Sequence, residues 1–383
     1  MSAPDGSGDG TPDPGTPLFL DHNAGTPVDP RVLALFLAVE ERCPGNPASV
    51  HAPGRRARAA LEDARARTAA ALGVDADEVV FCSGGTEADN LAVRGLGDPT
   101  LPVALAAVEH PAVFEAARDR GLVEWAVDRA GRTQLHEPDR PVGALALVHA
   151  QSEVGTIQPV VAAAELAAKM QVPLHVDAAQ SLGRLPLDEV FAAAATVALS
   201  PHKAGGLRGA GVLIVRRRAA PLRPLLRGGA QEHGLRAGTV NPALAAATAL
   251  AVELAVGERA ARAERMAAAR AAFVQALTAG RCSVDVLTPL QSSLPNTVMV
   301  CVRGVDGRAL LPALDLGGVA ASHGSACSSG SPQPPRVLAA MGVSPEDSRR
   351  CVRFSFARDH DAAFGARAGR RVDALLSRLQ KKK

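Results

Sequence analysis

The chain has 383 residues and a formal net charge of +3, with 42 basic and 39 acidic side chains mixed along its length. This small, evenly spread charge argues against a binding surface for nucleic acid or for an anionic membrane. Aromatic residues make up only 3% and tyrosine is absent, which argues against stacking platforms for bases or sugars.

The N-terminal segment, residues 1–17, is rich in proline, glycine and acidic residues. It lacks the features of a signal peptide and predicts a disordered tail. No apolar run reaches the roughly 18–20 residues of a membrane span. The six cysteines are widely spaced and form no C-x-x-C pair, so neither a disulfide scaffold nor a zinc site is expected. We therefore expect a cytoplasmic protein with reduced thiols and no bound metal.

Helical and strand patterns alternate after the tail. A helix is predicted over 57–73, and "EVVFCSGG" (78–85) reads as a strand that runs into a glycine turn before a helix at 86–97. Further strands are predicted at 144–150, 172–179, 195–200 and 211–217. This alternation is typical of an α/β layered fold with a mostly parallel sheet.

The pattern changes near Asn241. Residues 241–280 read as an almost continuous helix, and strands at 296–302 and 351–356 follow. We expect a large α/β domain at 18–260 and a smaller α+β domain at 261–383.

Two polar residues follow predicted strands of the large domain. Lys203 lies in "VALSPHKAGG" and Asp177 in "HVDAAQS". Most lysines are surface charges, and an aspartate at a strand end is as often a helix cap as a functional group. However, active sites of open α/β sheets lie at the carboxyl ends of strands, where a lysine can form a Schiff base and a carboxylate can pair with a pyridinium nitrogen.

Other candidates are weaker when taken singly. Gly85 and Thr86 stand where a strand meets a helix, a place suited to an anion, although most such glycines only turn the chain. His110 precedes a proline and is more often structural than catalytic. Arg353 lies in an apolar strand and needs a partner, either a substrate carboxylate or an internal acid. Cys327 lies in the Ser/Gly-rich stretch "ASHGSACSSGSPQP" (321–334), a polar setting that favours a reactive thiol.

Taken in order, these residues resemble the cysteine desulfurases of the NifS/IscS type, enzymes of the class V aminotransferase family that depend on pyridoxal 5'-phosphate (PLP). The resemblance covers residues 19 to about 358. The matching stretches are "LDHNAGTPVDPRV", "GNPASVHAPGRRAR", "FCSGGTEADNLAVRG", "EHPAV", "EVGTIQPV", "HVDAAQSLGRLPLD", "SPHKAGGLRGAGVLIV", "GGAQEHGLRAGT", "LPNTVMV", "GSACSSGSPQPPRVLAAMG" and "VRFSFAR". The resemblance implies the PLP-dependent transferase fold of type I, with PLP in the large domain and the catalytic cysteine in the small one.

The resemblance also implies individual roles. Lys203 would hold PLP through its amine, Asp177 would pair with the ring nitrogen, and His110 would stack over the ring and help to move protons. Cys327 would be the nucleophile. The remaining cofactor contacts would come from Gln180, Ser152, Gly85, Thr86, Ser200, His202 and Thr239. Thr239 would reach the phosphate from a second subunit, which implies a homodimer. Arg353 would bind the substrate carboxylate with help from Asn46.

The implied reaction converts L-cysteine to L-alanine and leaves the sulfur on Cys327 as a persulfide, to be passed to an acceptor protein. The acceptor's pathway, whether iron–sulfur clusters, tRNA thiolation or another product, is left open. Gln151 and Ser152 replace the two asparagines usual in the family, and His22, Gly25, His233 and His323 are further departures. Two alternatives therefore stand beside the desulfurase: a selenocysteine lyase or other PLP enzyme of the same fold, and a non-catalytic scaffold or regulator of a sulfur-transfer complex.

Overall fold

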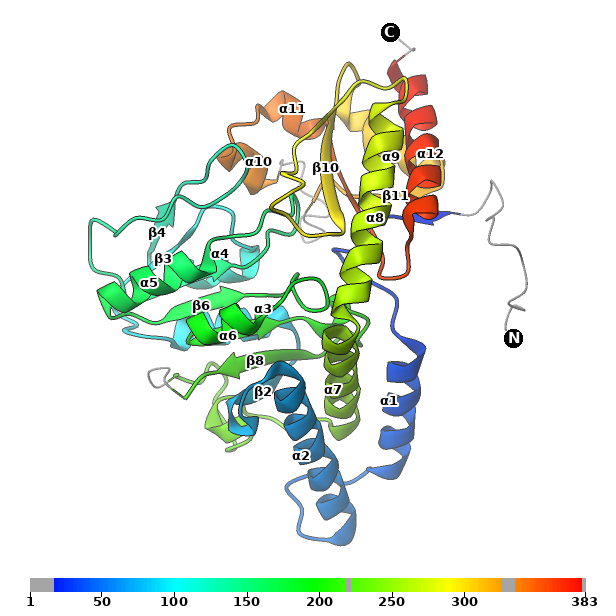
Figure 1. Ribbon diagram of the computed structural model, residues 1–383. Helices are drawn as coiled ribbons and strands as arrows, with labels where there is room; N and C mark the ends of the chain where they lie inside the picture. The colour runs from blue at the N-terminus through cyan, green and yellow to red at the C-terminus, as the bar shows by residue number, and fades with distance from the viewer. Residues whose placement is uncertain (1–16, 218–221, 325–334, 381–383) are drawn as a thin grey trace.

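The computed structural model describes residues 17–217, 222–324 and 335–380. The predicted tail, apart from its last residue, and Cys327 lie outside the described residues. Figure 1 shows a seven-stranded sheet with helices on both faces, joined by long helices to a smaller sheet near the C-terminus. Among the described residues, no helix combines the length and apolar character needed to cross a membrane.

The large sheet confirms the predicted α/β fold. Its strand order is β2-β8-β7-β6-β5-β3-β4, and only β8 runs antiparallel to its neighbours. The strands are β2 (Val79–Cys82), β3 (Val103–Ala106), β4 (Leu122–Trp125), β5 (Ala144–Val148), β6 (Leu174–Asp177), β7 (Thr196–Leu199) and β8 (Gly211–Val215). β5, β6 and β7 are buried along their whole length, as expected for parallel strands covered on both faces. β3 and β4 are additions to the predicted set.

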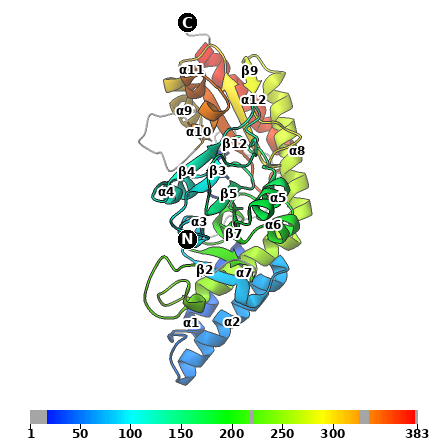
Figure 2. The same cartoon turned by 90° about the vertical axis from the view of Figure 1, so that its left-hand side faces the viewer.

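Four helices cover the two faces of this sheet. They are α3 (Gly85–Gly95), α4 (Pro111–Arg118), α5 (Val160–Met170) and α6 (Asp188–Ala193). Figures 1 and 2 show α5 and α6 on one face and α3 and α4 on the other. As the chain enters α3 and α4 directly from loops at the carboxyl edge of the sheet, the residues that begin these helices are brought to that edge.

The helices α1 (Pro30–Arg42), α2 (Ala52–Leu72) and α7 (Pro242–Gly257) pack together beside the sheet. Each begins with a side-chain cap followed by a proline in the first turn, a combination that satisfies free backbone N–H groups. In α2 the cap is His51, so the helix starts five residues before the predicted boundary. It ends, as predicted, at Gly73, which adopts a left-handed conformation with φ 67°.

The predicted helix at 241–280 is two helices, α7 and α8 (Arg259–Thr278), separated at Glu258. Gly257 is a poor helix former, and Glu258 has φ −96° and ψ 4°. The Glu258 carboxylate pairs with Arg31 at the start of α1 and with Arg262 in α8. The break is therefore held by ion pairs to both sides.

The smaller sheet has the antiparallel order β12-β10-β9. Its strands are β9 (Val284–Val286), β10 (Thr297–Val302) and β12 (Cys351–Ser355), and the helices around it are α8, α9 (Gly307–Leu316), α10 (Arg336–Ala340), α11 (Pro345–Arg349) and α12 (Ala362–Gln380). A short parallel pair joins β1 (Leu18–Phe19) to β11 (Val319–Ala320). The hydrophobic core around the smaller sheet contains Phe273, Phe354 and Phe356, which are all fully buried. Burial of each side chain stabilises the fold by roughly 1.5–3 kcal/mol. The division of the chain at residue 260 stays a prediction.

Candidate active site

A cavity of about 410 Å³ opens at the carboxyl edge of the large sheet, where β12 of the small sheet approaches it. Its walls come from segments far apart in the sequence. The polar side chains that line it are those of Asn23, Ser83, Thr86, Glu87, Asp89, Glu109, His110, Gln151, Ser152, Glu153, Asp177, Gln180, Ser200, His202, Lys203, Arg208, Arg336 and Arg353.

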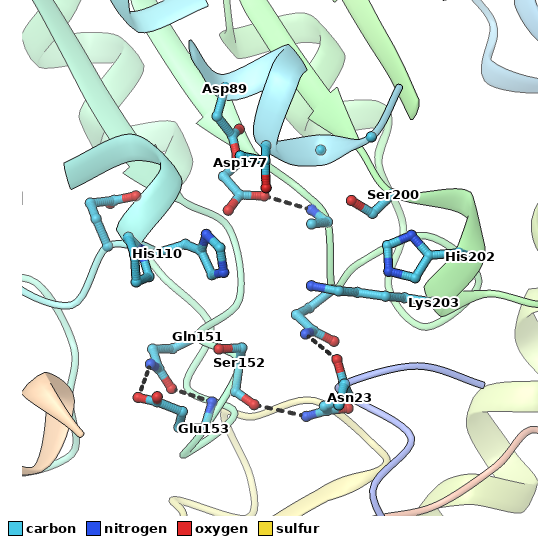
Figure 3. A pocket seen from close by; sticks show the side chains of 18 of the residues that line it. Asn23, Asp89, His110, Gln151, Ser152, Glu153, Asp177, Ser200, His202 and Lys203 are labelled. Atoms are coloured by element: carbon cyan, nitrogen blue, oxygen red, sulfur yellow. Dashed lines mark hydrogen bonds between the residues drawn. The ribbon is translucent and has the colours of Figure 1, made fainter. Parts of the chain in front are cut away.

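Asp177 lies at the end of β6 and is almost fully buried. Its Oδ1 accepts a hydrogen bond from the Ala179 backbone N–H at 2.8 Å, which fixes the carboxylate. Ligand atoms of Asp177, His110 and Asp89 lie within 4.8 Å of one another, and Figure 3 shows Asp89 directly behind Asp177. A fixed, buried carboxylate at this place can hold a protonated ring nitrogen.

Lys203 ends a short 3₁₀ turn, Pro201–Lys203, that follows β7. Its side chain is enclosed by protein except where it faces the pocket (Figure 3). Burial lowers the Lys203 pKa, and the nearby Asp177 carboxylate opposes that shift. A lysine amine with a lowered pKa is more often unprotonated, and only the unprotonated amine is nucleophilic. The neighbouring His202 has a pKa lowered by burial to about 4, so its ring is neutral.

The start of α3 forms a cradle beside Lys203. Gly84 caps the helix, and Gly85 and Thr86 are its first residues. A Cβ atom at Gly85 would come to 2.2 Å from the Ser200 Oγ, so only glycine lets this hydroxyl approach the helix end. The free backbone N–H groups of the first turn favour an anion here.

His110 is the N-terminal cap of α4, and its ring points into the pocket (Figure 3). Its Nδ1 accepts a hydrogen bond from the Ala112 backbone N–H at 3.1 Å. Burial lowers the pKa of His110, with Asp177 acting in the opposite direction. The ring is therefore neutral and carries its proton on Nε2, from which it can donate.

Arg353 enters the pocket from β12 and is 2% exposed. One Nη donates to the Asp21 carboxylate at 2.5 Å and the other to the Ser152 carbonyl at 2.9 Å, while Nε has no hydrogen-bond partner among the described residues. The same Ser152 carbonyl accepts a hydrogen bond from the Asn23 amide. Arg353 is thus a positioned, buried cation at the junction of the two sheets, suited to a small carboxylate.

Gln180 and Gln151 serve largely to hold loops. The Gln180 Nε2 donates to the Asn23 carbonyl at 3.0 Å, and its Oε1 accepts from Arg184. The Gln151 Oε1 accepts from the backbone N–H groups of Glu153 and Val154, so this side chain closes its own turn. Gln180 keeps one amide hydrogen for a ligand, whereas Ser152 lines the pocket beside it.

Two predicted residues lie away from this cavity. Asn46 is exposed and its Oδ1 accepts from the Ala48 N–H. Thr239 is exposed and lines a neighbouring cavity of about 150 Å³ with Arg236. Cys327 lies outside the described residues, but Gly324 and Arg336, which flank residues 325–334, both line the pocket. The described residues on both sides of 325–334 therefore reach the edge of the pocket.

The pocket also contains polar residues that the sequence pattern did not single out, namely Asn23, Asp89, Glu109, Glu153 and Arg208. Asp89 comes from the buried face of α3, four residues after Gly85. Its burial on an amphipathic helix is the one signal that points to it, because a charged residue on an apolar face needs a partner.

Known proteins resemble this chain over most of its length. The family profile described as "Aminotransferase class-V" matches residues 18–363. The "Cysteine desulfurase IscS" of Dictyoglomus turgidum is 34% identical over 88% of this chain and 89% of that protein. The "IscS-like cysteine desulfurase" of Mycobacterium tuberculosis is 35% identical over 94% of this chain and 98% of that protein.

Solved structures agree with these sequence matches. A "NifS-like protein" superposes with a TM-score of 0.83 at 30% identity, covering 96% of this chain and 99% of that one. DndA from Streptomyces lividans superposes with a TM-score of 0.72, also at 30% identity, covering 87% and 98%. SspA in complex with cysteine gives a TM-score of 0.76 at 27% identity, with 90% and 99% covered.

Proposed function

The chain belongs to the aminotransferase class V family, and from this premise we propose that it is a cysteine desulfurase that converts L-cysteine to L-alanine and keeps the sulfur as a persulfide on Cys327. One observation carries the proposal. Lys203 and Asp177 face one pocket, and the segment that holds Cys327 begins and ends at the edge of that pocket. A simple lyase or transaminase needs no cysteine there.

The family and its fold imply PLP in general, and the residues of this pocket fit it. The cradle at Gly85 and Ser200 suits a phosphate, Asp177 suits a pyridinium nitrogen, and Lys203 supplies an amine whose pKa burial lowers. We propose that Thr86, His202 and Gln180 complete the contacts, with Ser152 beside them. When bound, PLP withdraws electrons from the substrate Cα.

The chain's own groups would then act in turn. Arg353 would hold the substrate carboxylate, and the Lys203 Nζ would take the proton from Cα. The neutral His110 would donate or accept a proton at its Nε2. The Cys327 thiolate would attack the substrate sulfur, forming a sulfur–sulfur bond while the carbon–sulfur bond breaks and its electron pair stays on the carbon skeleton. That skeleton would take up a proton at Cβ and regain one at Cα, and it would leave as alanine.

The test is alanine and sulfide release from L-cysteine, with PLP and a thiol reductant, for the wild type and Cys327→Ser. Cys43→Ser, which removes a half-buried thiol in another region, is the matched control. Activity in the wild type and the control alone supports the proposal. Full activity of Cys327→Ser excludes the persulfide role, and a strong preference for selenocysteine in both variants would favour a lyase instead. A protein that binds no PLP would favour the scaffold.

We also propose a homodimer. Thr239 is exposed and lies outside the lining of its own chain's pocket, as expected if it serves a second subunit, and α1 exposes Leu33 and Leu37. Mixed dimers test this: Lys203→Ala and Thr239→Ala subunits, refolded together, contain one pocket with both residues intact. Recovery of tight PLP binding beyond that of either variant supports a shared site. A monomer by light scattering, or no recovery, contradicts it. A sulfur-acceptor protein is part of the proposal, and its identity is open.

A further inference from the structure

A buried pair of polar side chains lies behind Asp177. His175, two residues earlier on β6, has its Nε2 3.2 Å from the Asp89 Oδ1 and its Nδ1 3.0 Å from the Thr196 hydroxyl. Asp89, His175 and Thr196 are 2%, 1% and 0% exposed. Within the described part of the chain, Asp89 has no arginine or lysine at ion-pair distance. Both side chains of the pair are therefore almost fully buried, and Asp89 also lines the pocket.

Ionisation of both Asp89 and Asp177 at the same time is energetically unfavourable. Their oxygen atoms lie within 4.8 Å of each other and both side chains are almost fully buried, and two like charges so placed compete for a proton. Asp177 has a backbone donor fixed on its Oδ1 and faces the cavity, where a cation can stabilise it. Asp89 points to His175 instead. The geometry makes Asp89 the group that holds the proton.

We propose that Asp89 is a permanently neutral carboxylic acid, hydrogen-bonded to a neutral His175, and that it thereby keeps the negative charge of this cluster on Asp177. The inference rests on the proposed PLP site, because its consequence is for the ring nitrogen that Asp177 would hold. Asp89 is then a positioning residue, which acts on the ring nitrogen through Asp177.

The surrounding groups support this assignment. Burial, with Asp177 second, raises the pKa of Asp89 well above its ordinary value, and Lys203 opposes the shift. Burial lowers the pKa of His175 to about 4, against the opposing effect of Asp177. His110, from α4, and Glu109, just before it, are the other titratable groups near the pair. Both pKa shifts favour the neutral forms of Asp89 and His175.

The charge state matters for the cofactor. If Asp89 were ionised, two negative charges would face each other in the protein interior, and this cluster would compete with the ring nitrogen for its proton. A neutral acid removes that repulsion and still holds His175. An apolar residue would leave the His175 Nε2 buried without a partner, which costs stability.

Infrared spectroscopy of the apoenzyme in D₂O tests the charge directly, without PLP. A protonated carboxyl group gives an absorption band separate from the bands of ionised carboxylates. We expect bands of protonated carboxyl groups to persist at pH 8. The second buried acid, Glu109, also has a pKa raised by burial, so it should contribute its own band. Asp89→Asn should remove one band and Glu109→Gln the other. No protonated band in the wild type at pH 8, or an unchanged spectrum in Asp89→Asn, overturns the proposal. If Asp89→Asn does not fold, Glu109→Gln decides, since it must leave one band.

A second readout uses bound PLP. The pH midpoint of its visible absorbance should be the same in Asp89→Asn and the wild type, because asparagine copies the neutral acid. A shift of about one pH unit or more, equivalent to a tenfold change, would mean that a charge was removed and would overturn the proposal. Asp177→Asn should change the spectrum strongly. If the wild type binds no PLP, the proposed function fails, while the infrared result still decides the charge of Asp89.

Discussion

Arg353 and Asp21 form an ion pair at the junction of the two sheets although 332 residues separate them in the sequence. Asp21 follows the first short strand, and a β-bridge joins it to Ser355 on β12. The sequence left two partners open for Arg353, an internal acid and a substrate carboxylate. The structure shows the internal acid, Asp21, and also places Arg353 in the pocket. A substrate carboxylate would share a cation already oriented by Asp21.

Arg353→Lys should raise KM for L-cysteine by about tenfold to a hundredfold while kcat changes less, because a lysine cannot bind Asp21 and a carboxylate in the same fork geometry. The measurement is alanine formation against cysteine concentration. Arg349→Lys, at an exposed position nearby, serves as the control and should leave both constants unchanged. A normal KM in Arg353→Lys would assign the carboxylate to another residue.

Lys203→Met should stabilise the apoenzyme at pH 7. The folded pKa of Lys203 lies below its unfolded value, so the unfolded chain binds the extra proton, and stability rises with pH between the two values. Methionine has no proton to lose on folding, so it removes the free-energy cost of burying the Lys203 amine and the pH dependence that comes with it. Urea unfolding at several pH values measures it. The exposed Lys169→Met should change stability by no more than about 0.5 kcal/mol, and an equal effect of the two variants would contradict the argument.

His149 should make the protein sensitive to mild acid. Burial lowers its pKa to about 4, and its Nδ1 has no partner. Because the unfolded chain takes up a proton near pH 6.5 and the folded chain does not, stability falls as the pH drops from 6.5 to 4. Between these two pH values, the free energy of unfolding of His149→Gln should fall by roughly 1–3 kcal/mol less than that of the wild type. Denaturant titrations at the two pH values test this, with the exposed His136→Gln as the control.

Glu232→Gln should lower the free energy of unfolding by about 3–5 kcal/mol, because it removes the buried counter-charge of Arg65 and leaves only the exposed Glu62. The Glu232 carboxylate binds two Arg65 nitrogens at 2.6 and 3.0 Å and also accepts from the Phe81 N–H. Thermal and urea unfolding provide the measurement. The exposed ion pair of Arg217 with Asp77 is the control, where Asp77→Asn should cost under about 1 kcal/mol.

The sequence predicted the parts of the site that follow strands. Lys203, Asp177 and the Gly85 cradle are each next to an apolar run, and a parallel sheet brings such ends together. It could not place Asp89 or Asn23, because these reach the pocket through helix packing and a loop that crosses to the other sheet. Asn46 and Thr239 match the family motifs but lie outside the cavity of one chain, a relation that no single-chain pattern reveals.

The small break at Glu258 has a mechanical consequence. α7 is fixed against α1 and α2, whereas α8 packs against α12 beside the smaller sheet. Lys203 lies in the turn after β7, which contacts α7, and Arg353 lies on β12 of the smaller sheet, whose strand β10 contacts α8. The break at Glu258 therefore falls between the helices that support the two walls of the pocket. The ion pairs of Glu258 with Arg31 and Arg262 join the start of α1 to the first turns of α8 at this point.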